Sequence, residues 1–377
     1  MQILENHPLA PHTTMHIGGP AKKYIEVDTQ DELVDALTMA RKESLPVFVL
    51  GAGSNTLISD DGFLGCVIRL RFNAVEWKDQ EDGSTLVTMD GGADFDAVVE
   101  ESCRRNLGGI ESLSGIPGSA GGSLVQNIGA YGQEISETFV SAVAIHKVTG
   151  DIVDLSRDQL GFAYRQTTLK TPDNALIVVS VTLRLKPFDM DAACKRCAEH
   201  GFKKIAMSKP QNANALRRLV LETRRSKAMC YDPNDYNTHS VGSFFVNPVV
   251  PNEEAQRLNA AHILKYHKPM PSFPADGGTK LSAAWLIENS GFTRGYGYKG
   301  AALSAQHCLA IVNRQNATCA DVVEFAQDIS KRVYLLFHIE LTPEVVYLTP
   351  SGIEKLACKT QDVEVNGVTF RPNPLFL

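Results

Sequence analysis

Apolar and polar positions in the first fifty residues follow the order strand, helix, strand. Residues 24–27, Tyr-Ile-Glu-Val, predict a strand, and apolar residues recur at helical spacing between residues 33 and 40. Thr29 and Glu32 have the spacing of a capping box, which predicts that the helix begins there. The apolar run at residues 46–50 is typical of a buried strand.

Strands outnumber helices in the next part of the chain. We expect strands at residues 66–70, 85–89, 140–148 and 176–185, with a helix near residues 95–107. This mixture, with abundant strand, predicts the α+β class.

The pattern changes at Pro187, where a polar, helix-rich connector begins. The last region combines a strand at residues 343–347 with three helices, expected near residues 253–264, 280–290 and 321–337. We interpret the apolar stripe of the third helix as core. The predicted domains are residues 1–187 with lobes of about 1–72 and 73–187, the connector 188–226, a second domain over 227–350, and a tail over 351–377.

Length and composition are those of an ordinary globular protein. The 377 residues suggest two or three domains, and the apolar and charged shares of 44% and 21% are far from those of disordered chains. The net charge of -6 provides no positive field for nucleic acid. The N-terminus lacks a signal-peptide pattern, and no apolar run approaches the roughly 20 residues of a membrane span. We expect a cytoplasmic monomer with neither a nucleic-acid nor a membrane partner.

Eight cysteines are spread along the chain, a pattern that fits reduced thiols better than a disulfide framework. Cys194 and Cys197 form the one close pair. A zinc site would need a second ligand pair, and a thioredoxin-like site would need a strand leading into the motif. We therefore interpret the pair as two unrelated thiols on a helix and expect no metal site.

A glycine-rich stretch, Gly51-Ala-Gly-Ser-Asn-Thr56, directly follows the second apolar strand. Glycine allows the backbone to turn sharply and to bring several N–H groups close to an anion. The stretch fits either a phosphate cradle or a tight turn between strands. It is not a Rossmann fingerprint, because the third glycine is missing and residues 57–62 lack the pattern of a long helix.

A second glycine-rich stretch, residues 115–123, contains four glycines and a proline. Gln126 and Asn127 follow it, and their amides can both donate and accept hydrogen bonds. Two such stretches could hold one long dinucleotide. A flavin needs backbone amides at its pyrophosphate and polar groups along its ring edge, so FAD is one option among several.

Several motifs occur in the order found in one enzyme family. They are Gly51-Ala-Gly-Ser-Asn-Thr56, Ile116-Pro-Gly-Ser-Ala-Gly-Gly-Ser123, Gln126-Asn-Ile-Gly-Ala-Tyr-Gly132, Tyr164-Arg165 and Gly242-Ser-Phe-Phe-Val-Asn-Pro248. His12-Thr-Thr14, Lys280-Leu-Ser-Ala-Ala-Trp-Leu-Ile287 and Pro343-Glu-Val345 also fit. From about residue 8 to residue 348, the chain resembles the UDP-N-acetylenolpyruvoylglucosamine reductases, the MurB family.

The resemblance implies an FAD-binding domain of the vanillyl-alcohol-oxidase (PCMH-like) type in two lobes, followed by a smaller α+β substrate-binding domain. It implies that FAD receives hydride from NADPH and passes it to UDP-N-acetylglucosamine enolpyruvate, which gives UDP-N-acetylmuramate for peptidoglycan synthesis. The residues that match the cofactor site of the family are Gly51, Ala52, Gly53, Ser54, Asn55, Thr56, Ile116, Pro117, Gly118, Gly121, Gly122, Ser123, Gln126, Asn127, Gly129, Ala130 and Tyr164.

Three further matches carry the implied reaction. Hydride addition to C3 of the enolpyruvyl group leaves negative charge at C2 and in the carboxylate, which the Arg165 guanidinium could stabilise. Glu344 could assist as a protonated acid, and Ser243 matches the residue that protonates C2. Without the motifs, Arg165 fits a surface ion pair and Glu344 an ordinary polar residue on a strand.

Arg224, Lys227, Asn247 and Lys280 could bind the UDP diphosphate of the substrate or the nicotinamide cofactor. Arg224 and Lys227 align with a family pattern, but they also fit solvated surface charges. The chain departs from the family at the connector, because many members carry a tyrosine there, whereas residues 188–230 contain none. Tyr231 or Tyr236 could take its place.

Two other functions remain to be compared with reductase activity. The first is a flavin oxidase of the same superfamily, which is disfavoured because residues 51–60 lack a histidine for covalent flavin attachment. The second is an FAD-binding protein without catalysis, which the joint presence of Arg165, Ser243 and Glu344 argues against.

Overall fold

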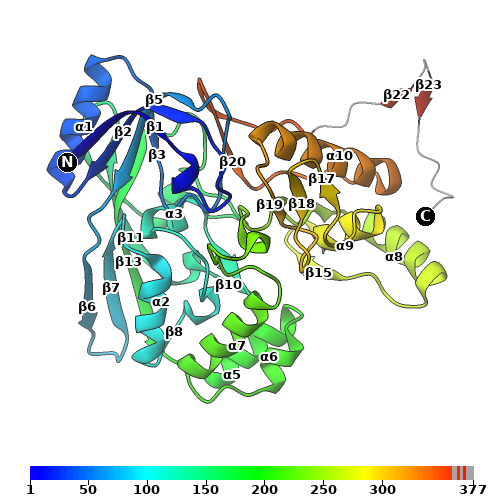
Figure 1. Ribbon diagram of the computed structural model, residues 1–377. Coiled ribbons are helices and arrows are strands. Elements are labelled where there is room, and N and C mark those ends of the chain that lie inside the picture. Colours follow the sequence, from blue (N-terminus) through cyan, green and yellow to red (C-terminus); the bar gives the residue numbers. More distant parts are fainter. Residues whose placement is uncertain (359–362, 366–367, 371–377) are drawn as a thin grey trace.

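The N-terminal lobe of the computed structural model is a four-stranded sheet with a helix against one face (Figure 1). The strand order is β1-β2-β5-β3, with β1 antiparallel to β2 and the other pairs parallel. The structure describes residues 1–358, 363–365 and 368–370. The elements of this lobe are β1 (Gln2–Pro8), a 3-10 helix (Ala10–His12), β2 (Pro20–Val27), α1 (Gln30–Lys42), β3 (Val47–Val49), β4 (Thr56–Ile58) and β5 (Phe63–Leu70).

Alternation along β5 gives the sheet two apolar faces, because side chains two residues apart point to the same side. Cys66 and Ile68 pack with Leu33 and Leu37 of α1, whereas Val67 packs in a separate cluster on the other face. The predicted order strand, helix, strand is confirmed.

The capping box predicted at the start of α1 is only half formed. The Thr29 hydroxyl accepts the Glu32 N–H at 3.1 Å, as expected. The Glu32 carboxylate instead accepts the N–H of Asp28 at 2.8 Å and the ammonium of Met1 at 2.7 Å. The predicted helix start is therefore right, but the reciprocal bond is wrong, because a positive charge competes for the carboxylate.

The second lobe is a six-stranded sheet in the order β12-β11-β13-β7-β6, with β8 pairing the end of β13. Apolar residues of α2 and α3 pack against Val87 and Val181 of this sheet. The helix expected over residues 95–107 ends at Arg104. The elements are β6 (Val75–Asp79), β7 (Thr85–Asp90), α2 (Phe95–Arg104), β8 (Leu107–Gly108), two 3-10 helices (Glu111–Leu113 and Ile135–Thr138), α3 (Ala120–Val125), β9 (Gly129–Ala130), β10 (Gln133–Glu134), β11 (Phe139–His146), β12 (Ile152–Leu155), α4 (Arg157–Leu160) and β13 (Leu176–Pro187).

A bulge lets β13 contribute to two cores. The pairing of β13 with β11 skips Val179. Ile177 and Val179 pack with the first lobe around α1, whereas Val181 and Leu183 pack in the core of the second lobe. An extra residue in one strand re-aims the side chains that follow it. The two lobes are thus joined through one continuous strand.

The connector consists of three helices, as its polar pattern predicted. Arg217 donates to both carboxylate oxygens of Asp96 on α2, at 2.6 and 3.0 Å, and so attaches the connector to the second lobe. Cys194 and Cys197 are free thiols on α5, and the described residues contain no group of three metal-ligating side chains. The helices are α5 (Met190–Glu199), α6 (Lys203–Met207) and α7 (Ala213–Arg225).

The C-terminal region packs its helices around small antiparallel sheets (Figure 1). Val322, Phe325 and Ile329 of α10 are fully buried, which confirms that the stripe is core. The helix expected over 280–290 begins later, because Lys280 belongs to a strand. The elements are a 3-10 helix (Tyr236–Thr238), β14 (Val249–Val250), α8 (Asn252–Tyr266), β15 (Ser272–Ala275), β16 (Gly278–Leu281), α9 (Ala283–Asn289), β17 (Gly297–Tyr298), β18 (Ala301–Leu303), β19 (Ile311–Asn313), α10 (Cys319–Phe337), β20 (Val346–Thr349), β21 (Gly352–Glu354), β22 (Val363–Val365) and β23 (Val368–Phe370).

The C-terminal region returns to the first lobe through β20, which pairs in parallel with β4. Leu348 packs in the same cluster as Leu50 and Ile58. The strand expected at 343–347 therefore begins at Val346, and it belongs in space to the N-terminal lobe. The domain boundaries stay predictions. No helix among the described residues is long and apolar enough to cross a membrane.

Candidate active site

One large cavity, of about 1470 Å³, lies where the two lobes meet the C-terminal region. This volume exceeds the roughly 300–1,000 Å³ of a typical small-molecule site, so a long cofactor and a second ligand can both fit. The predicted residues that line the cavity are Gly51, Ala52, Gly53, Ser54, Asn55, Thr56, Ile116, Pro117, Gly118, Gly121, Gly122, Ser123, Gln126, Gly129, Tyr164, Arg165, Arg224, Ser243, Asn247 and Glu344.

Close backbone packing requires glycine in the first glycine-rich stretch. Gly53 has a φ of 64°, and a Cβ atom there would clash with the carbonyl oxygen of His12. The N–H of Thr14 donates to the Gly53 carbonyl at 3.2 Å. The Ser54 hydroxyl donates to the Pro117 carbonyl at 2.7 Å, so the two glycine-rich stretches lie side by side.

The second glycine-rich stretch continues into the short helix α3, which the sequence did not predict. The Ser119 hydroxyl caps α3 by accepting the Gly122 N–H at 3.2 Å. The Gly121 N–H donates to the Gly91 carbonyl at 2.9 Å and so fixes the helix against the second lobe. A Cβ atom on Gly51 would lie 2.8 Å from the Ser119 Oγ atom. The lack of a side chain thus permits the close approach of the two stretches.

Arg165 is held on the cavity wall by partners on several segments. Its backbone is left-handed, with a φ of 56°. Its Nη2 donates to the Gly129 carbonyl, and its Nε lies 3.3 Å from Oε1 of Glu344. Nη1 lies 3.6 Å from Oε1 of Glu134, but it is buried and has no hydrogen-bond partner among the described residues. An added acceptor, such as a ligand carboxylate, would satisfy this donor.

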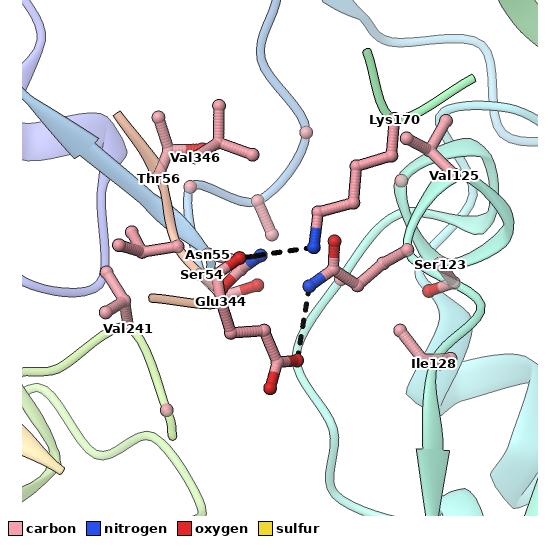
Figure 2. Close-up of a pocket in the computed structure, with 18 of the residues that line it drawn as sticks. Ser54, Asn55, Thr56, Ser123, Val125, Ile128, Lys170, Val241, Glu344 and Val346 are labelled. Atoms are coloured by element: carbon pink, nitrogen blue, oxygen red, sulfur yellow. Dashed lines mark hydrogen bonds between the residues drawn. The ribbon is translucent and has the colours of Figure 1, made fainter. Parts of the chain in front are cut away.

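Glu344 lies just before β20, where it faces the glycine-rich stretches (Figure 2). Its N–H donates to the Phe244 carbonyl at 2.8 Å, and its own carbonyl accepts from Asn55 at 3.4 Å and from Lys170 at 3.2 Å. The carboxylate accepts from the Gln126 amide at 3.2 Å. Its side chain is only 13% exposed, so the carboxyl group is directed to partners within the cavity rather than to bulk water.

Ser243 enters the cavity from a turn attached to the first lobe. Gly242 has a φ of 72°, and its N–H donates to the Ser240 hydroxyl at 3.2 Å. The Thr14 hydroxyl donates to the Ser240 carbonyl at 2.6 Å. The segment that supports the first glycine-rich stretch therefore also positions the turn that carries Ser243.

Two of the four predicted substrate-binding residues, Arg224 and Asn247, line the cavity. Arg224 lies in the last turn of α7, where its Nη2 donates to the Met229 carbonyl at 2.7 Å. Its Nε is buried with no hydrogen-bond partner in the described part of the chain. The Asn247 side chain accepts the N–H of Ala283 at 2.9 Å and so fixes the start of α9.

Lys280 and Lys227 are not among the residues that line the cavity. The Lys280 Nζ is 4.9 Å from the ring centre of Tyr164, which does line the cavity. The Lys227 Nζ is 5.8 Å from the ring centre of Phe202 in the connector. Burial lowers the pKa of both ammonium groups, and the nearby guanidinium groups of Arg165 and Arg224 lower it further. Their contacts with substrate stay predictions.

Two residues predicted to bind the cofactor, Asn127 and Ala130, are not part of the wall. The Asn127 amide donates to Glu134 at 2.9 Å and to the Ala163 carbonyl at 2.8 Å, and its oxygen accepts the Ser136 N–H at 3.3 Å. These bonds commit the side chain to the protein. We assign Asn127 the role of joining the segments that carry Arg165 and Gly129.

Residues that sequence reasoning passed over also line the cavity, namely Lys147, Lys170 and residues 353–358 of the tail. Burial lowers the pKa of both lysines. Tyr231 lines the cavity and its hydroxyl lies 2.8 Å from Nε2 of His16, whereas Tyr236 does not line it. Isolated lysines outside any motif carry no signal in a single sequence.

Family models match both the N-terminal and the C-terminal part of the chain. A family model for an FAD binding domain matches residues 21–156, and one for the C-terminal domain of UDP-N-acetylenolpyruvoylglucosamine reductase matches residues 232–348. A protein from Nocardia farcinica named UDP-N-acetylenolpyruvoylglucosamine reductase is 42% identical over 342 residues, which is 90% of this chain and 87% of that protein. The chain belongs to the UDP-N-acetylenolpyruvoylglucosamine reductase (MurB) family.

Other MurB proteins extend the comparison. The relative from Saccharopolyspora erythraea is 40% identical over 353 residues, covering 90% of this chain and 93% of its own length. The solved structure of MurB from Thermus caldophilus has 26% identity and a TM-score of 0.60, covering 92% of this chain and 98% of the other. The predicted fold class, an FAD-binding domain followed by a second α+β domain, is confirmed.

Proposed function

We propose that this MurB protein reduces UDP-N-acetylglucosamine enolpyruvate to UDP-N-acetylmuramate, a precursor of peptidoglycan, at the expense of NADPH. The observation that carries the proposal is the convergence of Arg165, Glu344 and Ser243 on one cavity with both glycine-rich stretches. Each comes from a different segment of the chain. A fold that only bound a dinucleotide would have no need of this arrangement.

The cavity suits FAD through the residues that would hold it. The backbone of the first glycine-rich stretch forms part of the cavity wall, and the packing around Gly53 leaves no room for a side chain. Gly118, Gly121 and Gly122 of the second glycine-rich stretch line the same cavity, so no side chain fills the space there. When bound, FAD would supply the hydride, taken from NADPH, that adds to C3 of the enolpyruvyl group.

Arg165 would bind the carboxylate of the enolpyruvyl group. Negative charge builds up at C2 and in this carboxylate as C3 gains hydride, so a fixed cation lowers the barrier. The buried Nη1 has no acceptor among the described residues, and the guanidinium plane suits a bidentate contact. The side chain is 18% exposed, so water competes weakly for these donors.

Glu344 and Ser243 would act on the negative charge that hydride addition leaves on the substrate. Without substrate, the Glu344 carboxylate contacts the Arg165 guanidinium, and a substrate carboxylate bound to Arg165 would replace this contact. Glu344 would then lie beside the charge formed on the substrate, to which only a neutral carboxylic acid can donate a hydrogen bond. The Ser243 hydroxyl would transfer its proton to C2, which completes the lactyl group.

The proposal is tested by steady-state kinetics of the purified holoenzyme. NADPH oxidation should depend on UDP-N-acetylglucosamine enolpyruvate and should yield UDP-N-acetylmuramate in equal amount. Ser243→Ala should keep FAD bound and still permit flavin reduction by NADPH, but turnover should fall by about 1,000-fold because the C2 proton donor is gone. NADPH oxidation that is indifferent to this substrate would refute the proposal.

A further inference from the structure

Lys170 bridges two of the proposed catalytic residues through their backbones. Its ammonium Nζ donates to the carbonyl of Arg165 at 3.3 Å and to the carbonyl of Glu344 at 3.2 Å. Figure 2 shows the lysine reaching across the cavity toward the Glu344 segment. Lys170 and Glu344 are 174 positions apart in sequence, so the contact joins the second lobe to the segment before β20.

The first of these bonds supports an unusual backbone. Arg165 has a φ of 56°, a left-handed conformation that costs a non-glycine residue about 1 kcal/mol or more. The bond from Lys170 closes the turn that follows Arg165 and holds its carbonyl in a fixed direction. The direction of the guanidinium therefore depends on a residue that does not touch it.

The second bond fixes the segment of Glu344. The Glu344 carbonyl that accepts from Lys170 also accepts from the Asn55 amide at 3.4 Å. Lys170 and the first glycine-rich stretch therefore hold the same oxygen atom. The Glu344 N–H is held from the other side by the Phe244 carbonyl at 2.8 Å. Phe244 directly follows Ser243, so the backbone contacts of Glu344 connect all three proposed catalytic residues.

The ammonium group is not engaged in an ion pair. No carboxylate oxygen lies within 4.0 Å of it in the described part of the chain, and its two known acceptors are neutral carbonyls. An ammonium group has three donors, so one remains for a further acceptor. Lys170 lines the cavity, and a simple structural lysine would gain more from a carboxylate partner or from bulk water.

We propose that Lys170 is a positioning residue for the step in which the reduced flavin reduces the substrate. Lys170 sets Arg165 and Glu344 at the separation that stabilises the charge formed on the substrate. The inference rests on the proposed function. It predicts that replacing Lys170 slows the reoxidation of reduced flavin by substrate but not the reduction of the flavin by NADPH. Only the reoxidation by substrate uses Arg165 and Glu344.

Rapid mixing of the holoenzyme separates the two steps. In Lys170→Met, reoxidation by UDP-N-acetylglucosamine enolpyruvate should slow by at least about tenfold, while FAD affinity and reduction by NADPH change by less than about threefold. Lys170→Arg keeps the charge and can donate to both carbonyls, so it should recover much of the rate. Lys186→Met, at an exposed position on β13 away from the cavity, serves as the matched control and should react like the unaltered protein.

Three outcomes would overturn the inference. Lys170→Met could reoxidise at the normal rate, it could slow both steps equally, or it could lose FAD; the last two would assign Lys170 a general structural or cofactor-binding role. Failure of the proposed function is recognised separately, because the unaltered protein would then not be reoxidised by this substrate at all.

Discussion

The Nε atom of Arg165 lies 3.3 Å from the Oε1 atom of Glu344. Arg165 belongs to the second lobe and Glu344 to the C-terminal region, and their side chains are 18% and 13% exposed. An ion pair with this little solvent is sensitive to geometry and to the loss of either partner. Substrate binding would therefore begin by replacing one carboxylate beside Arg165 with another.

Replacing the guanidinium at this position should impair the reaction even though the charge is kept. Arg165→Lys should lower kcat/KM by about 100-fold, because a lysine cannot contact a carboxylate with two parallel donors. FAD content should be unaffected. The measurement is steady-state turnover, with Arg218→Lys as the control because Arg218 is exposed on α7 and does not line the cavity. Normal kinetics in Arg165→Lys would remove Arg165 from substrate recognition.

Tyr231 should take the place of the tyrosine that the connector lacks. It lines the cavity, and burial raises the pKa of its hydroxyl, which therefore stays neutral beside His16. Tyr231→Ala should raise the KM for the UDP-sugar by about fivefold or more, with a smaller effect on kcat. Tyr236→Ala should leave KM within about twofold of normal. The reverse result would assign the role to Tyr236.

The first glycine-rich stretch should be intolerant of any side chain at position 53. In Gly53→Ala, the new Cβ atom would clash with the His12 carbonyl and the backbone would stay at a φ of 64°, so FAD affinity should fall by at least about tenfold. Flavin content after dialysis measures the effect. Gly297→Ala is the control, because its Cβ atom would have only an arginine side chain, 3.7 Å away, as a neighbour. Full flavin retention in Gly53→Ala would contradict this role of the stretch.

Acid should destabilise the protein in part through His307. Burial, together with the charges of Lys227 and Arg294, lowers the pKa of His307 to about 4, below its ordinary 6.5. Between these values the unfolded chain binds a proton that the folded protein does not, so stability falls as the pH drops through this window. Urea unfolding should show that His307→Gln loses about 2 kcal/mol less than the unaltered protein between pH 7 and pH 5. Equal losses would show that His307 is not the group responsible.

Local patterns predicted local structure well, and contacts between distant segments poorly. The strand and helix positions around α1 and the core stripe of α10 follow from periodicity, because each depends on neighbouring residues. The pairing of β20 with β4 joins segments that are almost three hundred positions apart, and no periodicity encodes it. The placement of Val346 in the first lobe is therefore a property of the folded molecule.

The candidate site divides in the same way. Ordered motifs indicated Arg165, Ser243 and Glu344, which lie together on the cavity wall. Asn127 occurs in such a motif, yet its amide donates hydrogen bonds to neighbouring protein segments instead of lining the cavity. The residue type and its position in the sequence do not reveal these bonds. Lys170 is the opposite case. It belongs to none of the motifs, and its role is inferred from the hydrogen bonds that it donates to two backbone carbonyls. The cytoplasmic location, the monomeric state and the use of NADPH stay predictions.

Anaerobic mixing of the NADPH-reduced holoenzyme with UDP-N-acetylglucosamine enolpyruvate tests the central claim most directly. We predict that the absorbance of oxidised flavin returns in one step and that one UDP-N-acetylmuramate forms for each flavin. In deuterated water, the deuterium should be found at C2, where the exchangeable Ser243 proton is delivered. Flavin that stays reduced with this substrate, but is reoxidised when oxygen is admitted, would contradict the account.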